Sequence, residues 1–137
     1  MKDDDIEVLE GPKTLKVLPD IKIILELISK GVSLKDTLNT LVDYIETNSK
    51  EMICSILLLD DENQLRHGAA PNLPEDYIRS INGIKIGQNI GSCGTAAYLN
   101  QQIVVADIAN DPLWKDFKEL ALIYDLRACW STPIRSS

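Results

Sequence analysis

A short apolar segment that ends in an acidic turn is the feature that most constrains the fold of this chain. Residues 52–59 are too few and too continuously apolar for an exposed helix, and they stop at the polar run 60–63. Residues 64–69 can then return antiparallel to the first strand. The sequence therefore predicts a buried β-hairpin.

Two amphipathic helices are predicted before this hairpin. The first has apolar residues at helical spacing, with Gly31 at the position of a left-handed C-terminal cap. The second begins after Ser33, whose side chain can cap it, and carries its own apolar stripe. The two stripes are Ile21, Ile24, Leu25 and Ile28, then Leu34, Leu38, Leu41 and Ile45.

A long connection follows the hairpin. Residues 71–92 contain two prolines and three glycines around a single predicted helix, 75–81, and a connection of this length is typical of a binding lid or wall. Beyond it, patterns predict a helix at 95–99, a strand at 103–108, a helix capped by Asp111 with its stripe from Leu113 to Tyr124, and a strand at 128–134. This order is typical of an α/β (α+β) domain.

Length and charge limit the possible partners. The chain has 137 residues, which fits one domain, and its 21 acidic against 14 basic residues give a net charge of -7. The electrostatic field of such an acidic chain disfavours binding to nucleic acid and to anionic lipid. No apolar run is long enough for a membrane helix, no secretory leader precedes the domain, and the three cysteines show no disulfide or CxxC pattern. We therefore expect a cytoplasmic protein with neither nucleic acid nor membrane as partner.

Four strings, in order and at similar spacing, resemble the GAF domain family, which comprises small-molecule-sensing modules of bacterial signalling proteins. They are LRHGAAPNLP at 65–74, GSCGTAAY at 91–98, VADI and DPLW within 105–114, and LRACWSTPI at 126–134. The resemblance covers about residues 18–137 and leaves 1–17 as a linker or N-terminal extension. Within the family, the chain most resembles GAF domains that accompany PAS, histidine kinase or diguanylate cyclase modules in two-component and related systems.

The resemblance implies a central, mostly antiparallel sheet with helices on both faces. In the family, a further strand and a closing helix follow the Trp-Ser-x-Pro-Ile strand, and we expect both to be missing after Ser137. Because the missing strand would lie centrally, we expect either the hairpin to pair directly with strand 128–134 or a second copy to supply a strand. The implied function is non-enzymatic: binding of an unidentified small molecule by a homodimer, with an output domain in the same parent chain.

Cys93 is the sharpest chemical feature. Its thiol lies in a glycine-rich turn that leads into a helix, where the helix dipole can lower a thiol pKa. A GAF-type enzyme, free methionine-(R)-sulfoxide reductase, has a similar Cys-Gly-Thr-Ala string, but its second cysteine string is not matched at Cys129. A packing role for Cys93 is therefore favoured, and a thiol-dependent reductase is the alternative. A structural dimerisation domain with a vestigial pocket is the second alternative.

Six residues of the four strings are candidates for lining a ligand pocket. His67 is the chain's one histidine, and both tryptophans carry large aromatic area, although packing or a structural hydrogen bond is the more common role for each. No nucleotide cradle, bilin-type Cys-His pair or metal-ligand spacing is present, so we expect no catalytic residue, no metal and no cofactor. The candidates are His67, Cys93, Tyr98, Asp107, Trp114 and Trp130.

Overall fold

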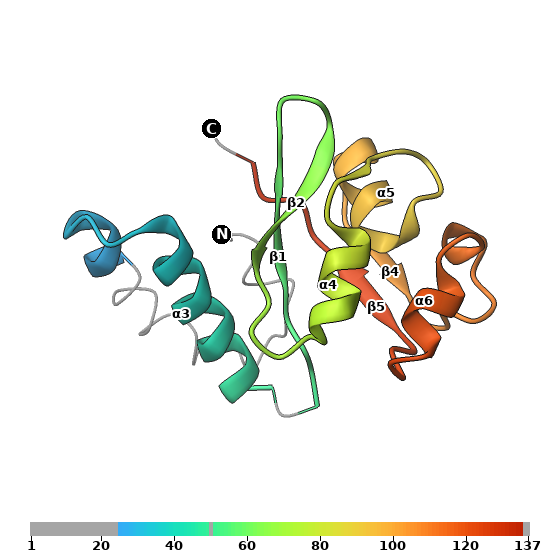
Figure 1. Ribbon diagram of the computed structural model, residues 1–137, viewed down its shortest axis with the longest axis horizontal. Coiled ribbons are helices and arrows are strands. Elements are labelled where there is room, and N and C mark those ends of the chain that lie inside the picture. Colours follow the sequence, from blue (N-terminus) through green and yellow to red (C-terminus); the bar gives the residue numbers. More distant parts are fainter. Residues whose placement is uncertain (1–24, 50, 136–137) are drawn as a thin grey trace. The chain divides into compact units, whose positions relative to one another are not determined.

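The computed structural model describes residues 25–49 and 51–135 (Figure 1). It combines helices with antiparallel strands, which confirms the predicted α+β class. The described chain divides into two compact units. One contains residues up to 57 together with 67–73, and the other contains 58–66 and residues from 74 onward.

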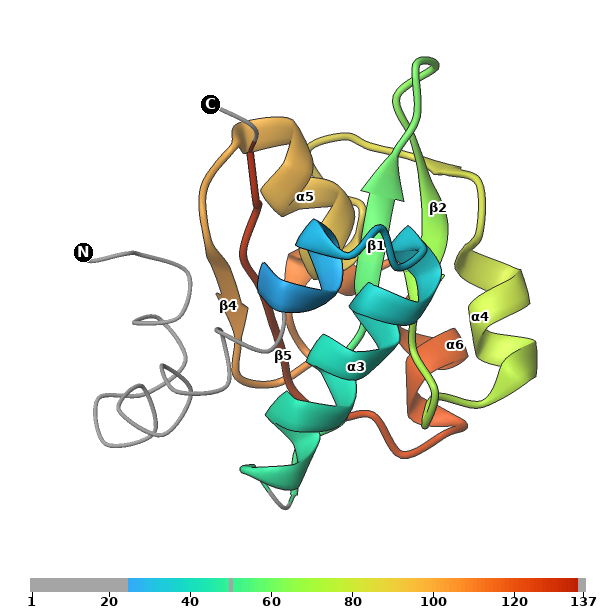
Figure 2. The ribbon, with the colours of Figure 1, turned by 90° about the vertical axis from the view of Figure 1, so that its left-hand side faces the viewer.

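The first unit contains the two predicted helices. Residues 25–29 are helical, and Gly31 has a φ of +77°, as expected for a left-handed helix end; residues 21–24 of the predicted helix lie outside the described range. Helix α3 (Leu34–Thr47), which is in the foreground of Figure 2, begins as predicted. Its Ser33 Oγ accepts a hydrogen bond from the Asp36 amide at 3.2 Å, so the predicted N-cap is confirmed.

The C-terminal end of α3 is hydrogen-bonded to two other segments of the same unit. One carboxylate oxygen of Glu46 accepts a hydrogen bond from the Cys54 amide at 2.7 Å, and the other accepts one from the Asn72 side-chain amide. The Cys54 amide therefore bonds to a side chain rather than to a strand ladder. Consequently strand β1 (Ile56–Leu59) begins four residues later than predicted.

The predicted hairpin is present, although it is less buried than expected. Strand β2 (Gln64–Ala69) neighbours β1, and the Asp60 carboxylate stabilises the turn by accepting from the Gln64 amide at 2.9 Å. The prediction of a fully buried strand was wrong for β1, because Leu58 and Leu59 are 39% and 50% exposed.

The long connection contains one more strand than predicted. Helix α4 (Glu75–Ile81) lies where the sequence places it, and strand β3 (Ile84–Lys85) then pairs antiparallel with β2. The described strands of this sheet have the order β1-β2-β3.

The rest of the second unit is built on a two-stranded sheet. Helix α5 packs on both strands, and Val104 faces Trp130 across the antiparallel ladder. Within the described residues, the hairpin therefore does not pair with the strand at 128–134, and the strands lie in two sheets rather than one. The elements are α5 (Gly91–Leu99), β4 (Ile103–Val105), η1 (Pro112–Trp114), α6 (Lys118–Leu122) and β5 (Cys129–Ser131).

Several predicted bounds needed correction in this unit. Helix α5 starts at Gly91 rather than 95, and both strands are shorter than expected. The predicted helix after Asp111 is divided into η1 and α6, because Phe117 leaves the helical conformation with a φ of -128°. Asp111 nonetheless caps η1, with its carboxylate accepting from the Leu113 amide at 2.9 Å.

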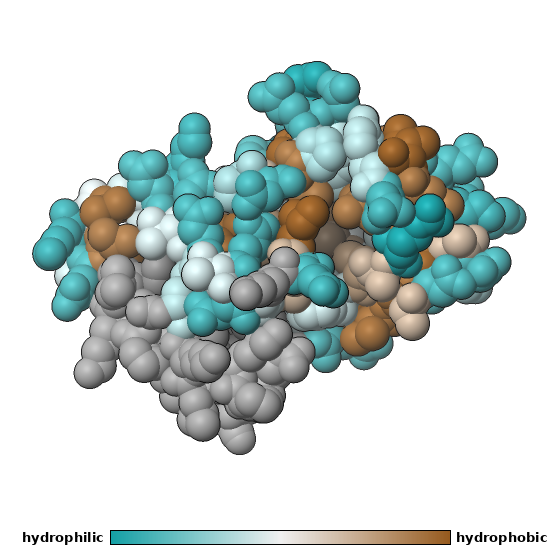
Figure 3. Space-filling model, turned by 90° about the horizontal axis from the view of Figure 1, so that it is seen from below, coloured by the Kyte–Doolittle hydropathy of each residue, from teal (hydrophilic) through white to brown (hydrophobic). Residues whose placement is uncertain are grey.

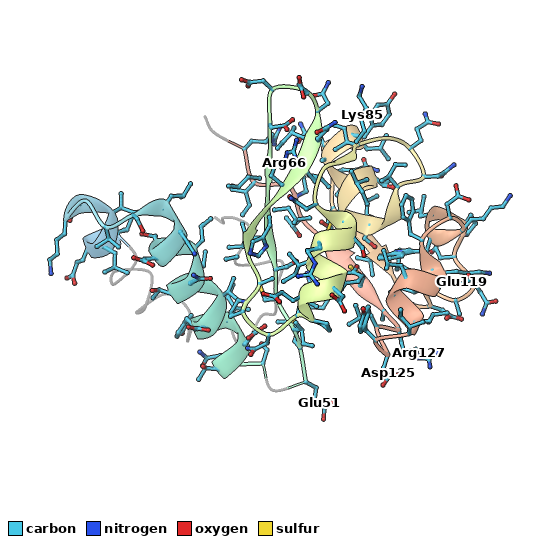
Figure 4. All side chains as sticks on the ribbon, viewed as in Figure 1. Glu51, Arg66, Lys85, Glu119, Asp125 and Arg127 are labelled. Atoms are coloured by element: carbon cyan, nitrogen blue, oxygen red, sulfur yellow. The ribbon has the colours of Figure 1, made fainter. Side chains whose placement is uncertain are left out.

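A tight turn leads into β5. Asp125 has a φ of +61°, and its carboxylate accepts from Arg127 Nε at 2.9 Å; both side chains are exposed, as Figure 4 shows. The Arg127 carbonyl in turn accepts from the Ile108 amide at 2.8 Å. These bonds set the direction in which the chain enters β5.

None of the helices in the described ranges combines the length and the hydropathy that crossing a membrane requires.

Candidate functional site

The turn that precedes α5 places Cys93 in the first turn of that helix. Gly91 has a φ of +61°, a region that favours glycine, and a Cβ there would lie 3.4 Å from the Trp114 ring. At Gly94, a Cβ would lie 2.5 Å from Ile90 Cβ, which is too close for any side chain. The glycines on either side of Cys93 are therefore required by conformation and by space.

Thr95 fixes the same turn from inside the helix. Its hydroxyl is 2.6 Å from the Gly91 carbonyl oxygen, to which it donates, and it accepts from the Ile90 amide at 3.2 Å. The Ile90 amide is thus satisfied although Ile90 has no capping side chain. This pattern explains why the helix begins at Gly91.

Strand β5 presents two polar side chains to Cys93. Because side chains alternate along a strand, Cys129 and Ser131 share one face while Trp130 lies on the other and is 37% exposed. Interactions with both residues of the shared face lower the pKa of Cys93. The first turn of α5 and one face of β5 therefore meet at a pair of half-buried thiols.

The two thiols differ strongly in acidity. The hydrogen bond from Cys129, with a further one from Ser131, lowers the pKa of Cys93 to about 7 although burial opposes this change. The same interaction with Cys93, together with burial, raises the pKa of Cys129 well above the usual thiol value. The pair therefore loses its first proton readily and its second with difficulty, with the thiolate on Cys93.

Aromatic and hydroxyl groups surround the thiols. Trp114 Nε1 donates to Ser92 Oγ at 3.0 Å, and both residues are buried. Burial and then the nearby thiols raise the pKa of Tyr77, which remains protonated at neutral pH. The Tyr77 ring meets Tyr124 edge-on, with centroids 6.0 Å apart. We call the following set the thiol cluster: Tyr77, Ser92, Cys93, Trp114, Cys129 and Ser131.

The thiol cluster contains two of the six residues that the sequence proposes as pocket candidates, namely Cys93 and Trp114. Tyr98 is 51% exposed on the last turn of α5, and Trp130 lies on the outer face of β5. The Asp107 carboxylate accepts from the Ala109 amide at 3.2 Å and from the Asn110 side chain at 2.7 Å, as part of a turn. His67 is exposed on β2, in the other unit.

Sequence reasoning missed the other four members of the cluster. For Cys129 and Ser131 a signal exists, because their spacing of two within a predicted strand places both on one face. Nothing local indicates that this face meets Cys93, since the contact joins distant segments.

Among the described residues, no group of three or more histidine, cysteine and acidic side chains is placed to hold a metal ion.

Comparisons with known proteins agree with the resemblance in the sequence. The model of a family described as GAF domain matches residues 31–137. The chain is also 39% identical over 115 residues to the methyl sulfide methyltransferase-associated sensor of Methanosarcina acetivorans. That match covers 83% of this chain but only 12% of the relative's length. No solved structure matches the chain.

Proposed function

The chain belongs to the GAF domain family, and from this premise we propose that it is a sensory, non-enzymatic domain of a signal transduction protein. The name of its relative, a sensor, supports this role. Because the match spans 12% of that relative, we place the output domain elsewhere in a longer parent protein. A cytoplasmic location and a two-component system are the setting that we propose.

We place the small-molecule site at the thiol cluster. The observation that carries this assignment is the grouping of polar side chains with large aromatic rings where α5 meets β5. Ligand sites commonly combine apolar and aromatic walls with a few polar groups that orient the ligand. Here Ser131 and Cys93 supply the polar contacts, and Trp114 supplies the aromatic wall.

Binding there would favour one arrangement of α5, η1 and β5 over others. A ligand shifts a conformational equilibrium only by its difference in affinity for the states. A molecule that contacts Ser131 on β5 and Cys93 on α5 would bind best when these elements are held together. We propose that the parent protein transmits this preference to its output domain.

The test is recovery of the ligand from the protein. The chain is purified without denaturation, and small molecules released by denaturation are identified by mass spectrometry and then titrated back. We expect Ser131→Ala to weaken binding about tenfold, as loss of one buried hydrogen bond costs about 1.5 kcal/mol. The matched control is Ser80→Ala, an exposed serine hydroxyl on α4, which should bind normally.

Two results would contradict the proposal. One is the absence of any released molecule together with no melting shift across a library of metabolites. The other is thioredoxin-linked turnover of free methionine-(R)-sulfoxide that is lost in Cys93→Ser, which would establish the reductase alternative.

A further inference from the structure

The junction between α4 and β3 contains the chain's one Asn-Gly pair, Asn82–Gly83. An asparagine side chain can react with the backbone nitrogen of the next residue, and a glycine there, which has no side chain, hinders the reaction least. Asparagine is one of the thermolabile residues of proteins. Because Asn82 is exposed, water and released ammonia can pass freely to and from its side chain.

The backbone of this junction requires glycine at position 83. Asn82 has a φ of -70° and a ψ of 123°, and Gly83 has a φ of +92°, values that fit the two central residues of a type II turn. A Cβ at position 83 would also lie 3.1 Å from Nη1 of Arg66, which Figure 4 labels. Conformation and space therefore keep a glycine next to Asn82.

The folded chain holds the two reacting groups apart. The Gly83 amide donates to the Leu65 carbonyl at 2.6 Å, so the nitrogen that would attack is engaged with β2. The ψ of 123° also turns this nitrogen away from the Asn82 Cβ, whereas ring closure requires both to lie on the same side of the Cα–C bond. The reaction therefore needs a rotation at Asn82 that breaks the bond to Leu65.

Few hydrogen bonds oppose that rotation. Strand β3 has two residues and lies at one edge of the described sheet, next to β2. Ile84 pairs with Leu65, and beyond the strand the Ile86 amide donates to the Asn63 carbonyl at 3.0 Å. So short an edge strand should open locally without unfolding of the whole domain.

We propose that Asn82–Gly83 is a site of spontaneous deamidation, which the pairing of β3 with β2 holds closed and local opening of β3 exposes. Two observations carry it beyond the dipeptide itself: the hydrogen bond of the Gly83 amide to β2 and the ψ of Asn82. The proposal is independent of the small-molecule site, since it concerns a covalent change of other residues.

The reaction consumes one water molecule and releases ammonia. The Gly83 nitrogen loses its proton to solvent and forms a bond with Cγ of Asn82, and the side-chain nitrogen takes up a proton and leaves as ammonia. Water then adds to one of the two carbonyl groups of the cyclic imide, and the carbon–nitrogen bond there breaks. Opening at Cγ gives aspartate, and opening at the backbone carbonyl gives isoaspartate, in which the chain runs through the side chain.

Either product changes the junction between α4 and β3. Both place a carboxylate at position 82. Isoaspartate also adds a methylene to the backbone, so Ile84 can no longer pair with Leu65 while α4 keeps its place. Deamidation should therefore release β3 from the sheet.

Peptide mapping tests the proposal, since trypsin releases Asn82 in the peptide 80–85. The whole chain is incubated at mildly alkaline pH, folded in one sample and unfolded by guanidinium chloride in another, and mass spectrometry follows the peptide and its two heavier products. We expect conversion to be slower by about tenfold or more in the folded chain, because it waits for β3 to open. Peptide 86–115 has three asparagines that bulkier residues follow, and it should change little in either sample.

Variants separate the site from the pairing that closes it. Asn82→Gln should show almost no conversion in either sample, since its longer side chain must form a larger and less favoured ring. Ile84→Ala, which truncates a half-buried side chain of β3, should react several-fold faster than the original chain when folded, and at the same rate when unfolded. Ser80→Ala, a change at an exposed hydroxyl of α4, is the matched control and should react at the original rate.

Three results would each overturn the proposal. They are equal rates in the folded and the unfolded chain, no conversion of peptide 80–85 in the unfolded chain, and a folded Ile84→Ala variant that reacts at the original rate. The comparison of folded and unfolded samples needs no substitution, so it decides the matter even where Ile84→Ala fails to fold. None of these outcomes depends on whether a small molecule binds.

Discussion

At the scale of single residues, the surroundings of each thiol determine its reactivity. Cys129 and Ser131 lower the pKa of Cys93, whereas burial and the Glu46 carboxylate raise the pKa of Cys54. The same functional group is therefore activated at one position and suppressed at the other.

We expect Cys93 to react with iodoacetamide far faster than Cys54 at pH 7. A pKa of about 7 leaves about half of Cys93 as thiolate, whereas a pKa of about 11 leaves Cys54 almost wholly protonated. The rate at Cys93 should rise with a midpoint near pH 7, as followed by mass spectrometry of the two peptides. In Cys129→Ala, which lacks the donor, this midpoint should move to higher pH. An unchanged midpoint would show that Cys129 does not stabilise the thiolate.

Gly94→Ala should destabilise the domain. Its new Cβ would lie 2.5 Å from Ile90 Cβ and Cγ2, so the turn before α5 must shift. Overpacking of this kind costs about 1–3 kcal/mol in the free energy of unfolding, measured by urea denaturation. Lys115→Ala, a change of an exposed side chain, is the control and should alter it by less than about 0.5 kcal/mol. Equal stability of both variants would contradict the close contact.

Trp114→Phe should destabilise the domain more than Trp130→Phe. The first change removes the indole donor from the buried Ser92 hydroxyl, and the second alters a side chain that is 37% exposed. The loss of a partner for a buried polar group costs about 1–3 kcal/mol. Circular dichroism during urea denaturation measures both variants without relying on tryptophan fluorescence. Equal losses would argue against a structural role of the indole hydrogen bond.

At the scale of elements, the sequence predicts what local chemistry determines. The cap at Ser33, the turn at Asp60 and the helix 75–81 are each encoded within a few neighbouring residues. Strand β3 has only two residues, which is too short for any alternation to be visible, so it was missed. The contact between Cys93 and Cys129 depends on how distant elements pack, and no local pattern reports it.

The connection between β3 and α5 should be the most mobile part of its unit. Within the long segment 73–90, α4 and β3 are held by regular bonds, such as that from the Gly83 amide to the Leu65 carbonyl at 2.6 Å. Gln88 and Asn89 are exposed and lie outside any helix or strand. Their amides should therefore exchange with solvent faster than those of β2 in hydrogen-exchange mass spectrometry. Protection equal to that of β2 would contradict the lid interpretation of this segment.

At the scale of the whole molecule, several large apolar side chains of the described residues are exposed. Figure 3 shows hydrophobic residues, coloured brown, among the hydrophilic residues of the surface. Val104 is 67% exposed and faces Trp130 across the ladder of β4 and β5, so the outer side of this sheet carries an apolar pair. Ile134, just beyond β5, is 69% exposed. Exposed apolar groups of this kind are typical of association surfaces, which supports the homodimer that the family resemblance implies.

We therefore expect the chain to self-associate through the outer side of the β4 and β5 sheet. Val104→Lys places a charge in that apolar pair, and burial of an unpaired charge is costly, so the dimer should dissociate at least tenfold more readily. Sedimentation equilibrium over a range of protein concentrations measures this constant. Ile123→Lys is the matched control, because Ile123 is 71% exposed outside this sheet and its replacement should leave association unchanged. A chain that stays monomeric at every concentration would contradict the proposed homodimer, and equal weakening by both variants would place the contact on another surface.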